Sequence, residues 1–495
     1  MPDEGQRSLS SGLRPLRGHL AAAVLLVFAA SVAAAGGVTP SGPALTSAAG
    51  GATGVGPVDQ LGVTTGVQAS GPVAPGAPGA PAAGSGVAAG GTSGVTAPLP
   101  GSTPKVYDQG VSDSEIKIGG STFTSGPAAV YGEQIAVGFT AGVQYINDHG
   151  GVNGRRISLK LYDDGADPAK QLANTKRLVE VDKVFALSMV YAASVGPYVA
   201  ESKVPVYHLG QFDDEFTNPY WFPVGGPQRL ASYQLSNFGV RKLGVKSVAI
   251  FYLDAGSNNF SRAYAEDVAS DWKAYGVKVP VLAPFAVDQT SCSDAIGKAS
   301  AAGVDFIQFE IDAGKVINCG VEAQIQGYKP PKGWGGYLIG VPVIHEALGD
   351  FSEGMYAFDA FGALYDNPDY KAYVAKVSSK TESYSSVTMS YFVSALLMRD
   401  SLAKLGDNIT RERLVEVLNG FKDWRPGLSD DPNQPIWTWS PSCHVALKGG
   451  YVIQIQKHDD KLKWTQITPQ LQTTPVPPGQ SPPARFGGCN IFEPG

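Results

Sequence analysis

Residues 115–164 decide the fold; they read EIKIGGSTFTSGPAAVYGEQIAVGFTAGVQYINDHGGVNGRRISLKLYDD. This stretch begins with an apolar strand over 116–123, followed by a loop. A helix is expected over 130–148, because its apolar residues recur at spacings of three and four. Gly150 and Gly151 end this helix, and a second strand follows at 157–162. A strand, a helix and a strand in this order predict a parallel pair joined by a right-handed crossover.

The same alternation continues from this stretch to about residue 428. Short apolar strands that alternate with helices predict an α/β fold of parallel sheets with helices on both faces. Two such runs, before and after about residue 226, suggest two lobes. Further strands are expected at 184–187, 204–208, 247–252, 277–285, 304–310, 336–339, 451–456 and 462–467. The other expected helices lie at 167–181, 194–202, 258–275, 292–302, 314–327, 369–378, 387–405 and 411–421.

An export signal is expected over residues 1–35. Arg7, Arg14 and Arg17 precede an uncharged apolar stretch that ends in small residues, Ala33-Ala34-Ala35. A basic start, a short apolar core and an A-x-A site are the parts of a secretory signal. The core is short for a membrane span, and no cysteine follows it, so a lipoprotein is not expected. We therefore predict an exported protein, secreted or held at the cell envelope; an uncleaved anchor is the open alternative.

Two segments have the composition of irregular chain. Residues 36–104 contain 18 glycines and 10 prolines, with Asp59 as their single charge. Such a segment buries too little apolar surface to offset the entropy of ordering. We predict a low-complexity disordered linker over 36–110, which is a tether or simply filler, and an irregular Pro-rich tail over 469–495.

Charge and motif content exclude several classes of function. From residue 105 onward the chain carries 35 Lys and Arg against 41 Asp and Glu, which argues against nucleic-acid binding. Its six histidines show no metal-site spacing, and no G-x-S-x-G motif is present. Asp163-Asp164 could suggest a metal, but we favour a role in capping the helix after Pro168 and closing the loop. No enzyme activity, cofactor or metal is expected.

Several motifs together resemble one family. Gly126–Gly132, Tyr145–Gly154, and Tyr162-Asp163-Asp164 with Asp167-Pro168 are similar to the start of leucine/isoleucine/valine-type (type I) periplasmic solute-binding proteins of ABC transporters. Ala302–Asp305 and Gln326–Pro330 fit the second half of that family. The resemblance covers about 111–468 and implies two Rossmann-like lobes joined by a hinge of three crossovers, which closes around ligand.

The crossovers are expected near 226, 360 and 429. One lobe would then hold 111–225 plus 361–428, and the other 226–360 plus 429–468.

The resemblance also implies a ligand site. The family binds an amino-acid carboxylate with the loops after the third and fourth strands, which here contain Tyr191, Ala192, Gln211, Phe212 and Asp213. Tyr131 falls where a family tyrosine covers the ligand; packing at the helix start is its alternative role. Ligands of open parallel sheets lie beyond the carboxyl ends of the strands. The site therefore also includes the strand-end residues Thr124, Ser125, Asp254 and Glu310.

Two departures from the family pattern bear on the ligand. The family acidic residue that pairs an ammonium group is missing at Val341-Pro342, although Glu310 is a weaker replacement. Asp213 stands where a hydroxyl is expected, and a buried aspartate beside a ligand carboxylate would be repulsive. We therefore expect a neutral or cationic small ligand, stacked on Tyr131, Tyr191 and Phe212 and hydrogen-bonded by Gln211 and Asp213, and not an ordinary branched-chain amino acid.

Four cysteines allow three disulfide connectivities. Family members carry cysteines in the same two helices as Cys292 and Cys319, so the resemblance implies that these two pair. Cys443 and Cys489 would then form the second bond. Export favours disulfides over free thiols.

The sequence thus predicts a monomeric receptor that delivers a small polar or amino-acid-like ligand to an ABC permease. The alternative is a ligand-sensing extracellular binding protein that is not coupled to transport.

Overall fold

The computed structural model describes residues 105–469, except 126–128, 191–194, 212, 256–259, 338, 380–384, 433 and 448. The expected signal at 1–35, nearly all of the linker and nearly all of the tail lie outside the described residues.

The first sheet has five parallel strands in the order β3-β2-β4-β5-β6. The long pair β2 and β3 is in register from Glu115 beside Arg156 to Thr122 beside Asp163, and the other strands have three residues each. The bounds are β2 Glu115–Thr122, β3 Arg156–Asp163, β4 Ala186–Ser188, β5 Val206–His208 and β6 Trp221–Pro223.

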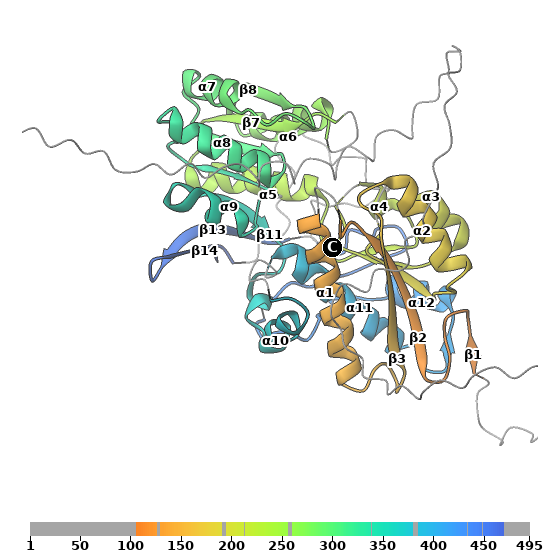
Figure 1. Cartoon of the computed structure of the whole chain (residues 1–495). Helices are drawn as coiled ribbons and strands as arrows, with labels where there is room; N and C mark the ends of the chain where they lie inside the picture. The colour runs from red at the N-terminus through yellow and green to blue at the C-terminus, as the bar shows by residue number, and fades with distance from the viewer. Residues whose placement is uncertain are drawn as a thin grey trace, which may run out of the picture. The chain divides into compact units, whose positions relative to one another are not determined.

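Helices from two distant parts of the chain cover this sheet (Figure 1). The first part contributes α1 Ala129–Asp148, α2 Pro168–Glu180, α3 Val195–Ser202 and α4 Asp213–Thr217. The second contributes α10 Pro368–Val377, α11 Ser386–Ala403 and α12 Arg411–Asn419. Helices α1 and α11 pack closely because glycines face the partner helix: a Cβ at Gly138 would overlap the Thr388 carbonyl oxygen. Ile118, Phe139 and Leu396 belong to the resulting first core.

The second sheet has seven strands in the order β14-β13-β11-β10-β9-β7-β8. Strands β7 to β11 are parallel neighbours, and β13 and β14 extend the sheet as an antiparallel hairpin. The bounds are β7 Ser247–Leu253, β8 Lys278–Phe285, β9 Phe306–Glu310, β10 Trp334–Gly336, β11 Tyr356–Asp359, β13 Tyr451–His458 and β14 Lys461–Gln466.

The helices of the second sheet come from the chain between and before its strands. They are α5 Gln228–Phe238, which continues into a π-helix at Gly239–Leu243, α6 Arg262–Ala274, α7 Ser293–Ala301, α8 Ala313–Ile325 and α9 Val343–Leu348. Side chains cap the N-termini of two of these helices: Ser261 accepts a hydrogen bond from the Tyr264 N–H in α6, and Asp312 accepts one from the Lys315 N–H in α8. Phe251, Ile307 and Trp334 belong to the second core.

The chain passes between the two cores three times within one compact unit. The first passage follows β6 and leads into α5, and the second follows β11. At the second passage, Asp359 accepts hydrogen bonds from the Phe361 and Gly362 N–H groups at 2.7 and 2.9 Å. Trp437 and Leu447 belong to the first core, so the third passage lies between Leu447 and β13, later than the expected 429. The α/β class with two parallel-sheet lobes is confirmed.

Several features of the fold were not expected from the sequence, helices α4 and α9 among them. Strand β6 and helix α5 lie where the sequence predicted neither a strand nor a helix. In addition, Val106–Tyr107 (β1) pairs with Asn408–Ile409 (β12) in a separate two-stranded sheet. Strand β6 is too short to show periodicity. Helix α5 is buried along its whole length yet mostly polar, so it lacks an apolar stripe.

Candidate functional site

The loop after β2 holds two of the predicted ligand-binding residues. Thr124 is half-buried and Ser125 is exposed. The Ser125 N–H donates to Asp163 Oδ1 at 3.1 Å, and its hydroxyl donates to Asp163 Oδ2. Partial burial alone would raise the pKa of Asp163. The pKa is lowered instead, because of these two bonds, a hydrogen bond from the Gly165 N–H and the nearby charge of Lys170. Ser125 is therefore fixed against an ionised carboxylate at the end of the neighbouring strand.

Asp164 closes the loop after β3. Its carboxylate accepts from the buried Ser121 hydroxyl at 2.8 Å and from the Ala166 N–H at 2.9 Å. The expected capping role belongs to another residue: Asp167 accepts from the Ala169 and Lys170 N–H groups at 2.8 and 3.1 Å. Capping by Asp163-Asp164 was therefore wrong, because Asp167 directly precedes the first turn of α2, whereas the loop closure is confirmed.

The loop after β5 joins the predicted Gln211 to two buried groups that the sequence did not single out. The Gln211 N–H donates to Glu215 Oε2 at 2.7 Å, and the same carboxylate lies 3.5 Å from His208 Nδ1. The Gln211 carbonyl accepts from the N–H of Gln228 at 3.3 Å, at the start of α5. This loop therefore connects the carboxyl edge of the first sheet with the first helix of the second lobe.

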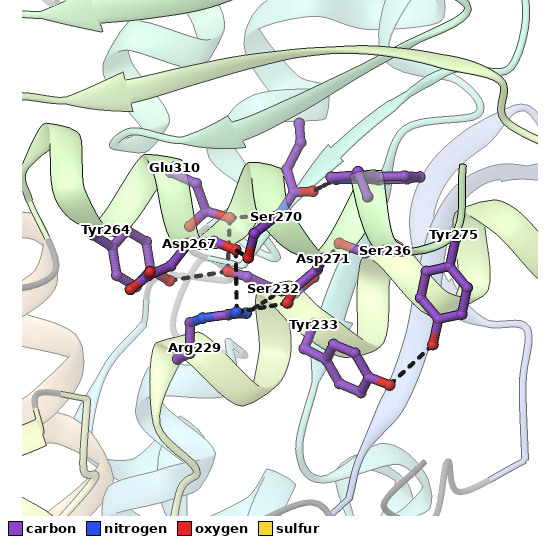
Figure 2. A network of polar contacts seen from close by, with 12 residues as sticks. Arg229, Ser232, Tyr233, Ser236, Tyr264, Asp267, Ser270, Asp271, Tyr275 and Glu310 are labelled. Carbon is purple, nitrogen blue, oxygen red and sulfur yellow. Dashed lines mark hydrogen bonds and ion pairs between the residues drawn. The ribbon is translucent and has the colours of Figure 1, made fainter. Parts of the chain in front are cut away.

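Glu310, at the end of β9, is the centre of a buried hydrogen-bond network (Figure 2). Glu310 Oε1 accepts from the Ser232 hydroxyl and from Gln308 Nε2, both at 2.6 Å, and Oε2 accepts from Gln228 Nε2 at 3.0 Å. Burial raises the pKa of Glu310, and these three donors oppose the rise only in part. Both carboxyl oxygens thus have partners within the chain.

A buried ion pair lies beside this network. Arg229 holds Asp271 with both ends of its guanidinium group, one bond being 2.6 Å from Nη2 to Oδ1. Its Nη2 also donates to the Asp267 carbonyl at 3.2 Å. Figure 2 shows that Arg229 reaches from α5 to α6, so the pair and the Glu310 network together fasten α5 to the second sheet.

Tyr131 lies near the start of α1 and contacts both cores. It packs against the first core, to which its own helix belongs, and against the second core. Burial and the Asp312 carboxylate raise the pKa of Tyr131, so the phenol stays neutral.

The remaining predicted site residues are not joined to these groups. Asp254 is exposed after β7, where its N–H donates to the Phe285 carbonyl at 2.8 Å. Asp213 begins α4, but its side chain is not described. Tyr191, Ala192 and Phe212 lie outside the described residues. The structure therefore brings together Gln211 and Glu310, through Gln228, and packs Tyr131 against the second core.

Sequence reasoning missed Gln228, Ser232 and Glu215. Pro227 immediately before the helix was a usable signal for the start of α5. No local signal shows that the polar side chains of α5 are buried, because their partner Glu310 is 78 residues from Ser232 and 82 from Gln228.

The predicted bond between Cys292 and Cys319 is confirmed; it joins the start of α7 to α8 across 27 residues. Cys443 is also disulfide-bonded. Cys489 lies outside the described residues, so the Cys443–Cys489 pairing stays a prediction.

Neither a metal site nor a membrane span is found among the described residues. They contain no group of three or more His, Cys, Asp or Glu residues arranged to hold a metal ion. In the same part of the chain, every helix is too short or too polar to cross a bilayer.

Comparisons with known proteins identify the fold. The chain is 24% identical over 317 residues to the leucine-, isoleucine-, valine-, threonine- and alanine-binding protein of Pseudomonas aeruginosa, covering 61% of this chain and 82% of that protein. A branched-chain amino acid ABC transporter protein from Thermus thermophilus with bound valine superposes with a TM-score of 0.63 at 17% identity, over 73% of this chain and 97% of that one.

A solute-binding protein from Rhodopseudomonas palustris in complex with p-hydroxybenzoic acid superposes with a TM-score of 0.62 at 18% identity, over 73% of this chain and 98% of that one. At these identities the two solved structures establish a shared fold. A family model described as periplasmic binding protein matches residues 115–460, most of the chain. The chain therefore belongs to the periplasmic binding protein family, as a leucine/isoleucine/valine-type (type I) member.

Proposed function

We propose that this protein is an extracytoplasmic receptor that binds one small molecule between its lobes and delivers it to an ABC importer. The observation that carries the proposal is a pair of sheets with polar loops at the ends of their parallel strands, around Gln211 and at the start of α8. The family match to periplasmic binding proteins supports the same function. A hinged pair of lobes of this kind binds ligand by closing around it. Monomeric action and a separate membrane permease are part of the proposal.

The ligand we propose is neutral or cationic. Three buried carboxyl groups follow the strands in the chain: Glu215 lies in α4 after β5, Glu310 ends β9, and Asp312 precedes α8. The two buried cations near them are already paired, Arg229 with Asp271 and Lys315 with Asp312 at 3.1 Å. A ligand carboxylate would therefore find both cations already paired, whereas a neutral or cationic ligand needs no cation to compensate it.

A thermal-shift screen tests both parts of the proposal. The full chain is screened against amino acids, amides, polyamines, aromatic acids and sugars, since a ligand of the native state raises the unfolding temperature. We expect a shift from neutral or cationic compounds and none from leucine, isoleucine or valine. Micromolar binding of any of these three in calorimetry would overturn the ligand assignment, and no shift with any class would overturn the receptor itself.

Gln211→Ala, compared with Gln289→Ala, locates the binding site. Gln211 lies in the loop after β5, and Gln289 lies in an exposed loop before α7. We expect the first change to weaken binding of the best hit about fivefold, the loss of one hydrogen bond, and the second to leave it unchanged. Equal effects of both changes would place the ligand elsewhere.

Uptake of labelled ligand by cells with and without the gene separates transport from sensing. Delivery to an importer predicts that uptake falls when the protein is absent. Unchanged uptake with intact binding would favour the alternative, a ligand-sensing protein not coupled to transport.

A further inference from the structure

The loop that contains Gln211 lies along the first passage between the lobes. Beyond the paired strands β5 and β6, the Val224 N–H donates to the His208 carbonyl at 3.0 Å. The next residue, Gly225, donates its N–H to the Leu209 carbonyl. A Cβ at Gly225 would overlap that carbonyl oxygen, so the close approach of the two segments requires glycine. The loop and the passage therefore stay paired up to the start of α5.

Helix α5 begins without a side-chain cap of its own. Pro227 precedes the helix and makes no side-chain capping bond, and the first N–H groups of a helix have no carbonyl partner within it. The N–H of Gln228, the first residue of α5, donates instead to the Gln211 carbonyl at 3.3 Å. A backbone group of the Gln211 loop thus caps the first helix of the second lobe.

The side chain of Gln228 connects the same residue to the second sheet. Its Nε2 donates to Glu310 Oε2 at 3.0 Å, and its Oε1 has no hydrogen-bond partner among the described residues. Ser232, one turn later in α5, donates to Glu310 Oε1 at 2.6 Å. Gln228 therefore bonds the Gln211 loop with its backbone and the second sheet with its side chain.

We propose that Gln228 is a positioning residue of the ligand site, which transmits movement of the second lobe to the Gln211 loop. The inference rests on the proposed receptor function. Gln228 is fully buried, so it acts through the loop. Rotation at the hinge carries α5 with the second sheet, and the Gln211 carbonyl must follow the Gln228 N–H or lose this bond. The binding conformation of the loop is thereby coupled to the closed arrangement of the lobes.

Two substitutions in the full chain test this role. Gln228→Leu removes the side-chain bond to Glu310 and keeps the backbone N–H that bonds Gln211. Ser232→Ala is the matched control, because it removes another donor from the same carboxyl group, in the same helix but one turn further from the loop. Both variants weaken the attachment of α5 to Glu310, but only the first does so at the residue that bonds the loop.

Amide hydrogen exchange resolved by residue reports on the loop in the absence of any added compound. Each chain is first unfolded and refolded with its disulfides intact, to remove any bound molecule. The slowest amides of the second sheet measure the global loss of stability, for which each variant is corrected. The amides of Gly210 and Gln211 are hydrogen-bonded in the parent chain. After the correction, we expect both to exchange about tenfold faster in Gln228→Leu and at the parent rate in Ser232→Ala.

Calorimetry with the neutral or cationic compound that gives the largest shift in the screen reports on binding. We expect about fivefold weaker affinity in Gln228→Leu and the parent affinity in Ser232→Ala. Equal exchange rates of the loop in the two variants, or faster exchange with parent affinity, would overturn the positioning role. A screen without any hit would refute the receptor function instead, and the exchange rates alone would then decide whether Gln228 positions the loop.

Discussion

Glu310 illustrates how this protein buries a carboxyl group without giving it a cation of its own. Three neutral donors, from Ser232, Gln308 and Gln228, surround its two oxygens, while the nearby Arg229 is held by Asp271. Neutral donors offset less of the desolvation of a charge than a paired cation does, so the pKa of Glu310 is raised. The residue therefore links the stability of the second lobe to pH.

Glu310→Gln should flatten the pH dependence of stability. Because the folded chain binds this proton more tightly than the unfolded chain, the contribution of Glu310 to the free energy of unfolding is full below its ordinary pKa of 4.5. That contribution is lost as the pH rises through the raised pKa. Denaturant unfolding at stepped pH should show a shallower decline above 4.5 in the variant. The exposed Glu412→Gln should keep the parent slope; equal slopes in all three chains would contradict the assignment.

Asp271→Asn should strongly destabilise the fold. It leaves the buried Arg229 guanidinium without its carboxylate, and breaking a buried pair on one side typically costs about 3–5 kcal/mol. Denaturant unfolding measures the loss. Asp294→Asn is the control, since its pair with Lys298 is largely exposed and should contribute less than about 1 kcal/mol. A loss in Asp271→Asn no greater than in the control would argue against the pair as the anchor of α5.

At the scale of elements, the contact between α1 and α11 joins two segments that lie about 250 residues apart in the chain, as the bond from Ser385 to Gln134 illustrates. Glycines at 138 and 142 let the helices approach until the Thr388 carbonyl and the Ala395 methyl group fill the space that side chains would take. This contact completes the first lobe, because α10, α11 and α12 return to it only after strands β7 to β11 of the second sheet.

Gly138→Ala should lower stability by about 1–3 kcal/mol, because the new methyl group forces two close backbones apart. Thermal unfolding measures it. Gly297→Ala in α7 is the matched control: its new Cβ would come no nearer than 3.7 Å to Gln326 Oε1, so the helix should keep or gain stability. If neither change lowered the unfolding temperature, α1 and α11 would not be closely packed at Gly138.

Removing the disulfide by Cys292→Ala with Cys319→Ala should lower the free energy of unfolding by about 3 kcal/mol, since the bond closes a 27-residue segment. Denaturant titration measures it, and non-reducing peptide maps of the parent chain provide the control. A peptide joining Cys319 to Cys443 in those maps would contradict the connectivity.

For the whole molecule, local periodicity was enough to predict most of the fold but not the geometry of the site. Helix α1 and strands β2 and β3 follow patterns within 50 residues, and the structure places them within one or two residues of the expected bounds. The partners of Glu310 and Tyr131 come from segments far away in the sequence, so no local pattern reveals them. The resemblance implies that Tyr131 covers the ligand, which stays a prediction, and its packing against the second core is visible only in three dimensions.

The central claim is that the chain binds one small molecule reversibly and leaves it unchanged. Isothermal calorimetry of the full chain with the best compound from the thermal-shift screen, followed by mass spectrometry of the recovered compound, tests it most directly. We predict one site per chain, weakened by Gln211→Ala, and a compound recovered with its original mass. A compound recovered with a different mass, or no saturable binding to the folded chain, would contradict the account.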